Sequence, residues 1–359
     1  MKQSWIDSIF LLGRPFSPLY SMCMRIRQIA YEKGILKSIA VPRPVISVGN
    51  LSMGGTGKTP HVIAIARHLQ AKGFRPAVIS RGYGGKAGRG PVIVSSRNEI
   101  LEDSALSGDE PCMIAQQLPG VPVIVGKNRF VCAKTAISRF GADLIVMDDG
   151  FQHLALQRDV DIVLLPAASS FGNGYVFPGG HLRESPAGLA RASAVILSRC
   201  EQVPFNQIEL AKNKIHELCT SVPVFLSRTS FTGIRMAGTT ELARQVSAPA
   251  FCFCAIGDPD SFVTMLERHG VTVAGSLFFQ DHHVFTRKDL MQILNKAALC
   301  NAEILLTTAK DFARMEGLWQ QNFANRPDLP PVGIVEIEAE PEKSFFRFLD
   351  AVLPGAVRQ

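Results

Sequence analysis

The segment that decides the fold is Val45-Ile46-Ser47-Val48-Gly49-Asn50-Leu51-Ser52-Met53-Gly54-Gly55-Thr56-Gly57-Lys58-Thr59. Its first four residues predict a buried strand, and residues 59–70 predict a helix, so a glycine-rich loop joins the two. This is the setting of a phosphate-binding P-loop, whose backbone N–H groups surround phosphate oxygens. Lys58 would reach the β- and γ-phosphates, and the Thr59 hydroxyl would hold Mg²⁺. Ser52 replaces the first glycine of the usual pattern, and a purely structural glycine loop is the alternative.

Outward from this loop, short apolar segments alternate with helical patterns. The strands are expected at residues 77–80, 91–95, 121–125, 144–147, 162–165 and 195–198, and the helices at 109–117 and 128–140. Such alternation is typical of an α/β protein with a P-loop NTPase-like, mostly parallel sheet and helices on both of its faces. The alternation of expected strands and helices weakens after Pro223 and then resumes, which predicts a smaller second α/β domain.

The 359 residues therefore divide into four expected parts. Residues 1–37 form a basic amphipathic N-terminal segment, and residues 38–227 form the P-loop core domain. Residues 228–340 form the smaller domain, which would close over the active-site cleft. Residues 341–359 contain a closing helix that could pack back on the core domain.

A second motif with polar residues begins where the expected strand at residues 144–147 ends. Its sequence is Asp148-Asp149-Gly150-Phe151-Gln152-His153. An acidic residue at the end of an apolar strand can face the metal ion of a nucleotide held by a neighbouring P-loop. Asp148 fits that role, although a strand-end aspartate is often only a turn residue. Gln152 or His153 could orient a hydroxyl or phosphate, or could simply pack in the loop.

Asp109 precedes an expected helix in the sequence Gly108-Asp109-Glu110-Pro111. A carboxylate there could accept the proton of an attacking hydroxyl group. An aspartate followed by proline is also an ordinary helix cap, and the local sequence favours that interpretation.

Other polar clusters follow expected strands, including those at residues 271–278 and 303–307 of the second domain, and ligands of open α/β sheets bind at such strand ends. They are Asp281-His282-His283, Thr307-Thr308-Ala309-Lys310-Asp311, Arg81-Gly82-Tyr83-Gly84-Gly85 and Gly179-Gly180-His181-Leu182-Arg183-Glu184. The Asp-His-His group could bind a metal, orient a distant carboxylate, or be a solvated loop. Each cluster by itself is weak evidence of a site.

Composition limits the class of protein. Hydrophobic residues make up 47% and charged residues 19%, enough for a sizeable core and incompatible with a mainly disordered chain. The net charge of +7 favours an anionic partner. The eight cysteines are scattered without a CxxC pair, which favours a reducing, cytoplasmic setting. No apolar run reaches the length of a membrane-spanning helix, and the N-terminus lacks the pattern of a secretory signal.

The N-terminal segment combines apolar residues at helical spacing with an excess of basic residues, namely Lys2, Arg14, Arg25, Arg27, Lys33 and Lys37. A basic amphipathic helix of this type can lie in a membrane interface. A helix packed on the protein's own core is the alternative.

In their order along the chain, these motifs resemble those of the tetraacyldisaccharide 4′-kinase family, the lipid A kinases of Gram-negative bacteria. The resemblance rests on residues 49–60, 80–85, 108–111, 148–153, 182–184 and 281–283 and covers nearly the whole chain. That family has Ser or Thr at the position of Ser52. The resemblance implies ATP-dependent phosphorylation, with Mg²⁺, of the 4′-hydroxyl of a tetraacylated disaccharide 1-phosphate. It further implies a peripheral protein on the cytoplasmic leaflet of the inner membrane, with no nucleic-acid partner and no obligate protein partner.

The resemblance also implies roles for individual residues. Asp109 would be the base and His282, from the second domain, would orient it. Lys58, Asp149, Gln152 and His153 would complete the catalytic group. Thr59 and Asp148 would hold the metal, while Arg81 and Tyr83 would face the acceptor. The implied ATP-binding residues are Ser52, Met53, Gly54, Gly55, Thr56, Gly57, Lys58, Thr59, Arg183 and Glu184.

Three other classes of protein share part of this pattern. A membrane-associated P-loop ATPase switch would also have the P-loop, the strand-end aspartate and the amphipathic helix, but such proteins often have lysine where Met53 stands. A nucleic-acid-binding ATPase would fit the positive charge, but no basic stripe with interleaved aromatic residues is present. A non-enzymatic nucleotide-binding module would not need Asp109 or His282.

Overall fold

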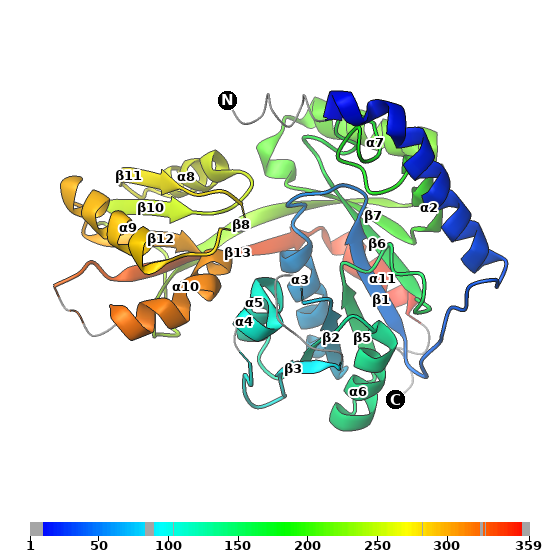
Figure 1. The fold of residues 1–359 in the computed structure, drawn as a ribbon, viewed down its shortest axis with the longest axis horizontal. Helices are drawn as coiled ribbons and strands as arrows, with labels where there is room; N and C mark the ends of the chain where they lie inside the picture. The colour runs from blue at the N-terminus through cyan, green and yellow to red at the C-terminus, as the bar shows by residue number, and fades with distance from the viewer. Residues whose placement is uncertain are drawn as a thin grey trace.

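The computed structural model describes residues 10–82, 90–102, 104–281, 283–323, 326 and 328–353, with the backbone alone at 104 and 105. Within these residues, thirteen strands form one sheet that runs through both halves of the molecule (Figure 1). The strands pair in the order β11-β10-β12-β13-β8-β7-β6-β1-β5-β2-β4-β3, and β9 pairs with β8. Helices cover both faces of the sheet, which confirms the predicted α/β class.

The P-loop half contains the strands from β1 to β7. Their bounds are β1 Val45–Asn50, β2 Pro76–Ser80, β3 Val92–Ser95, β4 Val123–Val125, β5 Leu144–Asp148, β6 Val160–Pro166 and β7 Ala194–Ser198. All neighbours in this half are parallel except β3 and β4. Residues on both faces of the central strands are buried, which explains their continuous apolar sequences.

Helices pack on both faces of these strands. They are α3 Lys58–Ala71, α4 Ser104–Ser107, α5 Asp109–Gln117, α6 Arg129–Phe140 and α7 Phe205–Leu218, with 3₁₀ turns η1 Arg14–Phe16, η2 Pro186–Arg191 and η3 Cys200–Gln202. Ile46 of β1 packs with α3 and α5, whereas Val45 packs with α6 on the other face. This alternation follows the two-residue period of a strand.

The second half repeats the same plan on a smaller scale. Its elements are β8 Val224–Met236, β9 Leu242–Ala243, β10 Ala250–Cys254, α8 Pro259–Arg268, β11 Val273–Phe278, α9 Arg287–Leu299, β12 Ile304–Thr308, α10 Ala309–Asn322 and β13 Val332–Pro341. Helices α9 and α10 pack on one face of the sheet and α8 packs on the other.

Strands β8 and β13 join the two halves. β8 begins parallel to β7, with Val224 opposite Val195 and Leu226 opposite Leu197. It then runs antiparallel to β13, which itself pairs with β12. The expected boundary between residues 227 and 228 therefore falls inside a continuous strand rather than in a linker.

The chain returns to the P-loop half through α11 Lys343–Val352. Phe345 packs against Phe225 with ring centroids 5.6 Å apart, and Phe346 stacks on His68 at 4.4 Å. Phe345 and Leu349 are both fully buried in the core shared with α3. The last helix thus stabilises the half of the molecule in which the chain began.

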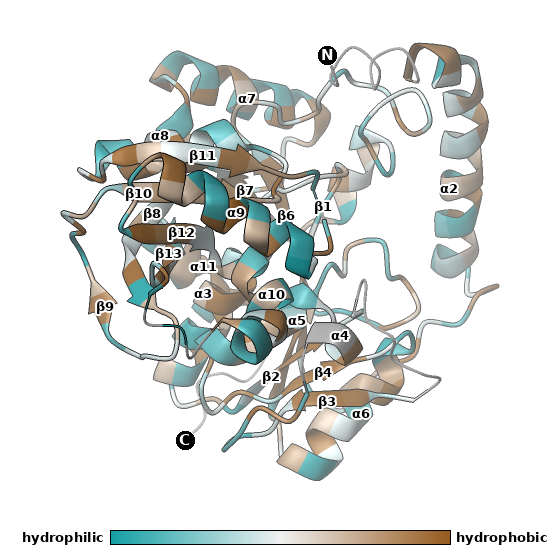
Figure 2. Cartoon of the chain, turned by 60° about the vertical axis from the view of Figure 1, so that its left-hand side comes forward, coloured by the Kyte–Doolittle hydropathy of each residue, from teal (hydrophilic) through white to brown (hydrophobic). Residues whose placement is uncertain are grey.

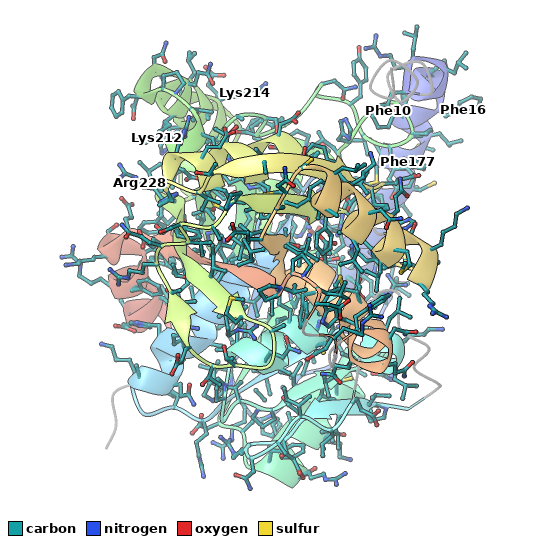
Figure 3. The ribbon with its side chains drawn as sticks, turned by 90° about the vertical axis from the view of Figure 1, so that its left-hand side faces the viewer. Phe10, Phe16, Phe177, Lys212, Lys214 and Arg228 are labelled. Carbon is teal, nitrogen blue, oxygen red and sulfur yellow. The ribbon has the colours of Figure 1, made fainter. Side chains whose placement is uncertain are left out.

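Helix α2 Ser17–Glu32 lies along the outside of the P-loop half (Figure 1). Its start is fixed because Ser17 Oγ donates to the Val176 carbonyl at 2.6 Å and accepts from the Gly179 N–H at 2.9 Å. Figure 3 shows Phe10, Phe16 and Phe177 gathered around this end of the helix. None of the helices in the described part of the chain is long and apolar enough to cross a membrane.

Candidate active site

The P-loop has the conformation that its sequence predicts. Gly54 and Gly57 have φ values of 110° and 81°, which residues with a Cβ rarely adopt. The loop is fixed from both sides: Asn50 Nδ2 donates to Thr56 Oγ1 at 2.9 Å, and Ser198 Oγ donates to the Thr56 carbonyl at 2.9 Å. Helix α3 begins at Lys58, so the positive end of its dipole faces the loop. The arrangement suits a bound polyphosphate.

Asp148 ends β5 beside the P-loop. Its Oδ2 accepts from Ser80 Oγ at 2.9 Å, whereas its buried Oδ1 has no hydrogen-bond partner among the described residues. Burial, reinforced by the Glu110 and Asp149 carboxylates, raises the pKa of Asp148 to about 7. An orphaned carboxylate oxygen at this position suits a cation that the protein itself does not supply.

Asp149 lies next to Asp148 but in the opposite electrostatic setting. Its backbone φ of 50° turns the side chain toward two cations. Arg183 Nη1 donates to both of its oxygens, at 2.7 and 2.9 Å, and Lys58 Nζ lies 3.5 Å from Oδ1. Burial alone would raise the pKa of Asp149, but Lys58 and Arg183 outweigh it and hold this pKa below its usual value. Asp149 therefore connects the P-loop lysine to the loop that contains Arg183.

Gln152 and Glu184 form a second connection to the P-loop strand. Gln152 Nε2 donates to the Asn50 carbonyl at 2.9 Å and to Glu184 Oε1 at 2.8 Å. Glu184 is also paired with Arg191 at 2.9 Å. These contacts hold the predicted Gln152 and Glu184 in the wall of the site.

A cavity of about 370 Å³ opens beside these residues. Its lining consists of Arg27, Arg81, Lys127, Arg129, Asp149, Gln152, His153 and Arg183. Five of these side chains are cationic and one is anionic, so the cavity suits an anionic ligand. Burial, together with the surrounding arginines, lowers the pKa of His153 to about 4, which makes it a neutral hydrogen-bonding group at pH 7.

Asp109 lies where the two halves meet. It is the first residue of α5, and its Oδ2 accepts from Nε of Arg314 on α10. One residue further, Glu110 pairs with Lys310 at 3.1 Å. The predicted base is thus part of a contact between the two halves.

Two predicted residues, His282 and Tyr83, lie outside the described residues. Of their neighbours, Asp281 is exposed, and His283 Nε2 lies 3.1 Å from Asp289 Oδ2 while its ring stacks on Phe279.

The structure brings most of the predicted residues together and adds others. Arg81, Asp149, Gln152, His153 and Arg183, predicted from separate motifs, line one cavity. Sequence reasoning missed four basic residues: Arg27, Lys127, Arg129 and Arg314. None of them belongs to a glycine-rich or acidic motif, and a single arginine carries no signal in the sequence. The excess of basic residues was the available hint.

A parallel sheet whose first strand leads into a P-loop, with an acidic strand end beside it, defines a P-loop nucleotide-binding protein. The family model described as tetraacyldisaccharide-1-P 4′-kinase matches residues 9–354. The chain belongs to this family of phosphotransferases, as its sequence motifs predicted.

Individual relatives agree with this assignment. A tetraacyldisaccharide 4′-kinase from Desulfotalea psychrophila is 39% identical over 86% of this chain and 89% of its own length. Its counterpart from Syntrophobacter fumaroxidans is 40% identical over 88% of this chain and 81% of its own length. Among solved structures, the "apo" form of LpxK from Aquifex aeolicus in complex with ATP is 29% identical. It superimposes with a TM-score of 0.74 over 94% of this chain and 98% of that one.

Proposed function

We propose that this ATP-dependent kinase of lipid A biosynthesis transfers the γ-phosphate of ATP to the 4′-hydroxyl of tetraacyldisaccharide 1-phosphate in the site described above. The observation that carries the proposal is the position of Asp149, which contacts both Lys58 of the P-loop and Arg183 of the basic cavity. A nucleotide on the P-loop and an anionic acceptor in the cavity would therefore be neighbours. Phosphoryl transfer depends mainly on such positioning and on neutralisation of charge.

On the nucleotide side, residues 52–59 enclose the phosphates, and Lys58 neutralises the β- and γ-phosphates. Asp148 and Thr59 are the residues that would hold Mg²⁺. The buried, unpartnered Oδ1 of Asp148 fits this ion, although the described residues contain no cluster of three acidic, histidine or cysteine side chains. One or two protein ligands are usual for Mg²⁺, because phosphates and water complete its shell. When bound, the ion would neutralise the charge that develops on the phosphates.

On the acceptor side, the basic cavity would hold the phosphorylated sugar. Arg129 is 3% exposed, and within the described part of the chain its Nε has no hydrogen-bond partner. A buried guanidinium edge without a partner suits an anionic oxygen. Arg81 lines the same cavity, while the neutral His153 would donate or accept a hydrogen bond with the sugar. We include Tyr83 as an acceptor residue on the family resemblance alone.

In the chemical step, the 4′-oxygen forms a bond to the γ-phosphorus while the bond from that phosphorus to the bridging oxygen of ADP breaks. The proton of the hydroxyl passes to the Asp109 carboxylate. Asp109 lies at the start of α5, next to the second half, and His282 would orient it from there. The contacts of Asp149, Gln152 and Glu184 hold the P-loop lysine and the cavity wall in fixed positions relative to each other.

Membrane docking is the remaining part of the proposal. The outer surface of α2 exposes Leu19 by 57%, Met22 by 53% and Ile26 by 58%. Figure 2 shows hydrophobic residues distributed along this helix, whose N-terminal end lies next to the loop around Phe177. Together with Arg14 and Arg25, this surface suits an anionic leaflet. We infer a peripheral location on the cytoplasmic face of the inner membrane, where the acylated acceptor is embedded.

The test is transfer of phosphate from Mg-ATP to tetraacyldisaccharide 1-phosphate in detergent micelles, with wild type and Asp109→Asn compared. We expect transfer by the wild type and a loss of at least about 100-fold in kcat for a folded variant that still binds ATP. Hydrolysis of ATP without transfer would contradict the proposal and favour the membrane-associated ATPase switch.

A further inference from the structure

Arg314 on α10 is the residue that reaches Asp109 across the contact between the two halves. Its Nε donates to Asp109 Oδ2, and its Nη1 donates to Asp311 Oδ1 at 2.9 Å and to the Ala255 carbonyl at 3.2 Å. The Arg314 side chain is only 5% exposed. Because two anchors within its own half already fix the guanidinium, its position does not depend on Asp109.

The anchor of Arg314 is itself rigid. Asp311 is fully buried, and its Oδ2 accepts from the Ala255 N–H at 3.0 Å and from Thr308 Oγ1 at 2.7 Å. Thr308 also caps α10 by accepting from the Asp311 N–H. Thr308 and Asp311, in a segment for which the sequence predicted no specific role, thus build the support that holds Arg314. Short, charge-assisted hydrogen bonds of this kind hold a side chain in one geometry.

At Asp109, the contact selects one carboxylate oxygen. The hydrogen bond from Arg314 uses Oδ2, and no side chain among the described residues hydrogen-bonds Oδ1, so this oxygen is the one offered to the acceptor hydroxyl. The Asp109 side chain is 27% exposed, so a ligand can reach the carboxylate. In phosphoryl transfer, the orientation of the acceptor oxygen matters more than strong basicity of the group that binds it.

We propose that Arg314 is a positioning residue for phosphoryl transfer: it fixes the Asp109 carboxylate so that Oδ1 faces the acceptor hydroxyl when the two halves are in contact. The inference rests on the proposed function, because it needs Asp109 to be the group that takes the proton. It adds to the reaction a residue from the second half, on helix α10, which packs against α5 (Figure 1).

A salt bridge that merely holds the halves together is the competing explanation. The same interface provides its control, since Lys310 pairs with Glu110 at 3.1 Å without contacting Asp109. Lys310→Gln therefore removes an ion pair between the halves and leaves Arg314 in place. Comparing the kcat values of Lys310→Gln and Arg314→Gln therefore distinguishes positioning of Asp109 from a salt bridge that only holds the two halves together.

The experiment measures kcat, KM and ATP affinity for wild type, Arg314→Gln, Lys310→Gln, Asp109→Asn and the double variant Asp109→Asn/Arg314→Gln. We expect Arg314→Gln to lower kcat by about 10- to 100-fold with unchanged ATP affinity, and Lys310→Gln to change kcat less than about threefold. In the Asp109→Asn background, Arg314→Gln should cause no further loss, because the group it positions is gone. Arg314→Lys provides a second variant if Arg314→Gln does not fold, and it should lose activity in the same direction.

Two results would overturn the inference. One is an Arg314→Gln or Arg314→Lys enzyme whose kcat matches that of Lys310→Gln. The other is a full, additive loss from Arg314→Gln in the Asp109→Asn background. Both presuppose that the wild type transfers phosphate and that Asp109→Asn lowers kcat by at least about 100-fold to a residual value that can still be measured. They therefore differ from a failure of the proposed function, in which the wild type itself shows no transfer.

Discussion

Two adjacent aspartates show how strongly the surroundings decide the chemistry of a residue. Burial raises the pKa of Asp148 to about 7, whereas Lys58 and Arg183 hold the pKa of Asp149 below its usual value. The sequence predicted both acids at the end of a strand and, through the family resemblance, assigned Asp148 to the metal and Asp149 to the catalytic group, but it did not predict their opposite electrostatic settings. The difference arises because Asp148 continues the buried strand and Asp149 turns away from it with a positive φ. Adjacent groups with such separated pKa values can take separate roles.

Arg27 allows a test of the basic cavity with a matched control. Its side chain lines the cavity from α2 and donates to the Gln152 carbonyl at 3.1 Å, whereas Arg25 on the same helix is exposed. We expect Arg27→Gln to raise the KM for the acceptor about tenfold, because one charged hydrogen bond to the acceptor is lost. The KM for ATP should not change. Arg25→Gln should leave both constants close to wild type in micelles. Equal effects of the two substitutions would contradict the assignment of the cavity.

His61 gives a prediction about pH. It is fully buried between the Gly57 carbonyl, 2.7 Å away, and Ser227 Oγ, 2.8 Å away, and burial lowers its pKa to about 4. The unfolded chain, in which histidine titrates near 6.5, binds the proton first, so the folded state loses stability as the pH falls from about 6.5 toward 4.

The measurement is the free energy of unfolding in urea, without nucleotide, at pH 7 and pH 5. Between these values the wild type should lose about 2 kcal/mol relative to His61→Gln, which has no imidazole to protonate. A difference between the two proteins that does not change with pH would mean that folding leaves the pKa of His61 unshifted, which would contradict the prediction.

At the scale of elements, strands β1 to β7 and helices α3, α5 and α6 of the P-loop half could be predicted almost to their ends, because their apolar patterns are local. Strand β8 and helices α7 and α10 were not predicted. β8 pairs with β7 at its start and with β13 over the rest of its length. Because its two parts have different surroundings, the strand shows no single alternation of apolar and polar residues. At residues 307–311, the sequence predicted only a strand end, but the structure begins α10 at Ala309.

Helix α2 provides a prediction at this scale. Leu19 and Ile26 are more than half exposed, so replacing both with serine should leave thermal unfolding unchanged. Binding to vesicles that contain anionic lipids should fall at least about tenfold, because two apolar side chains no longer enter the interface. Leu299→Ser, on α9 with 84% exposure, is the control and should bind like wild type. Undiminished binding of the double variant, measured by co-sedimentation, would contradict docking through α2.

The whole molecule depends on contacts between distant parts of the chain. The ribbon of β8 and β13 connects the halves, and α11 returns to the P-loop half after the second half is complete. Asp109 and Arg314, 205 residues apart in sequence, meet only because of this arrangement.

The packing of α11 can be tested by truncating Phe345, which is fully buried against Phe225. Phe345→Ala should lower the free energy of unfolding by about 3–5 kcal/mol, through lost burial and the cavity left behind. Phe205→Ala, at a side chain that is 72% exposed, should change it by less than about 0.5 kcal/mol. Urea denaturation measures both. A small effect of Phe345→Ala would mean that α11 contributes little to the core.

The sequence by itself determined the α/β class, the P-loop, the acidic strand end and the family, because these depend on local patterns of a few neighbouring residues. Only the tertiary structure decided that Arg27, Lys127 and Arg129 join Arg81 and Arg183 around one cavity. It alone also placed Arg314 on Asp109. The physical reason is that an arginine acts through charge and hydrogen bonds at the end of a long side chain. Its partner is therefore set by which elements pack together, and that information is spread over the whole chain.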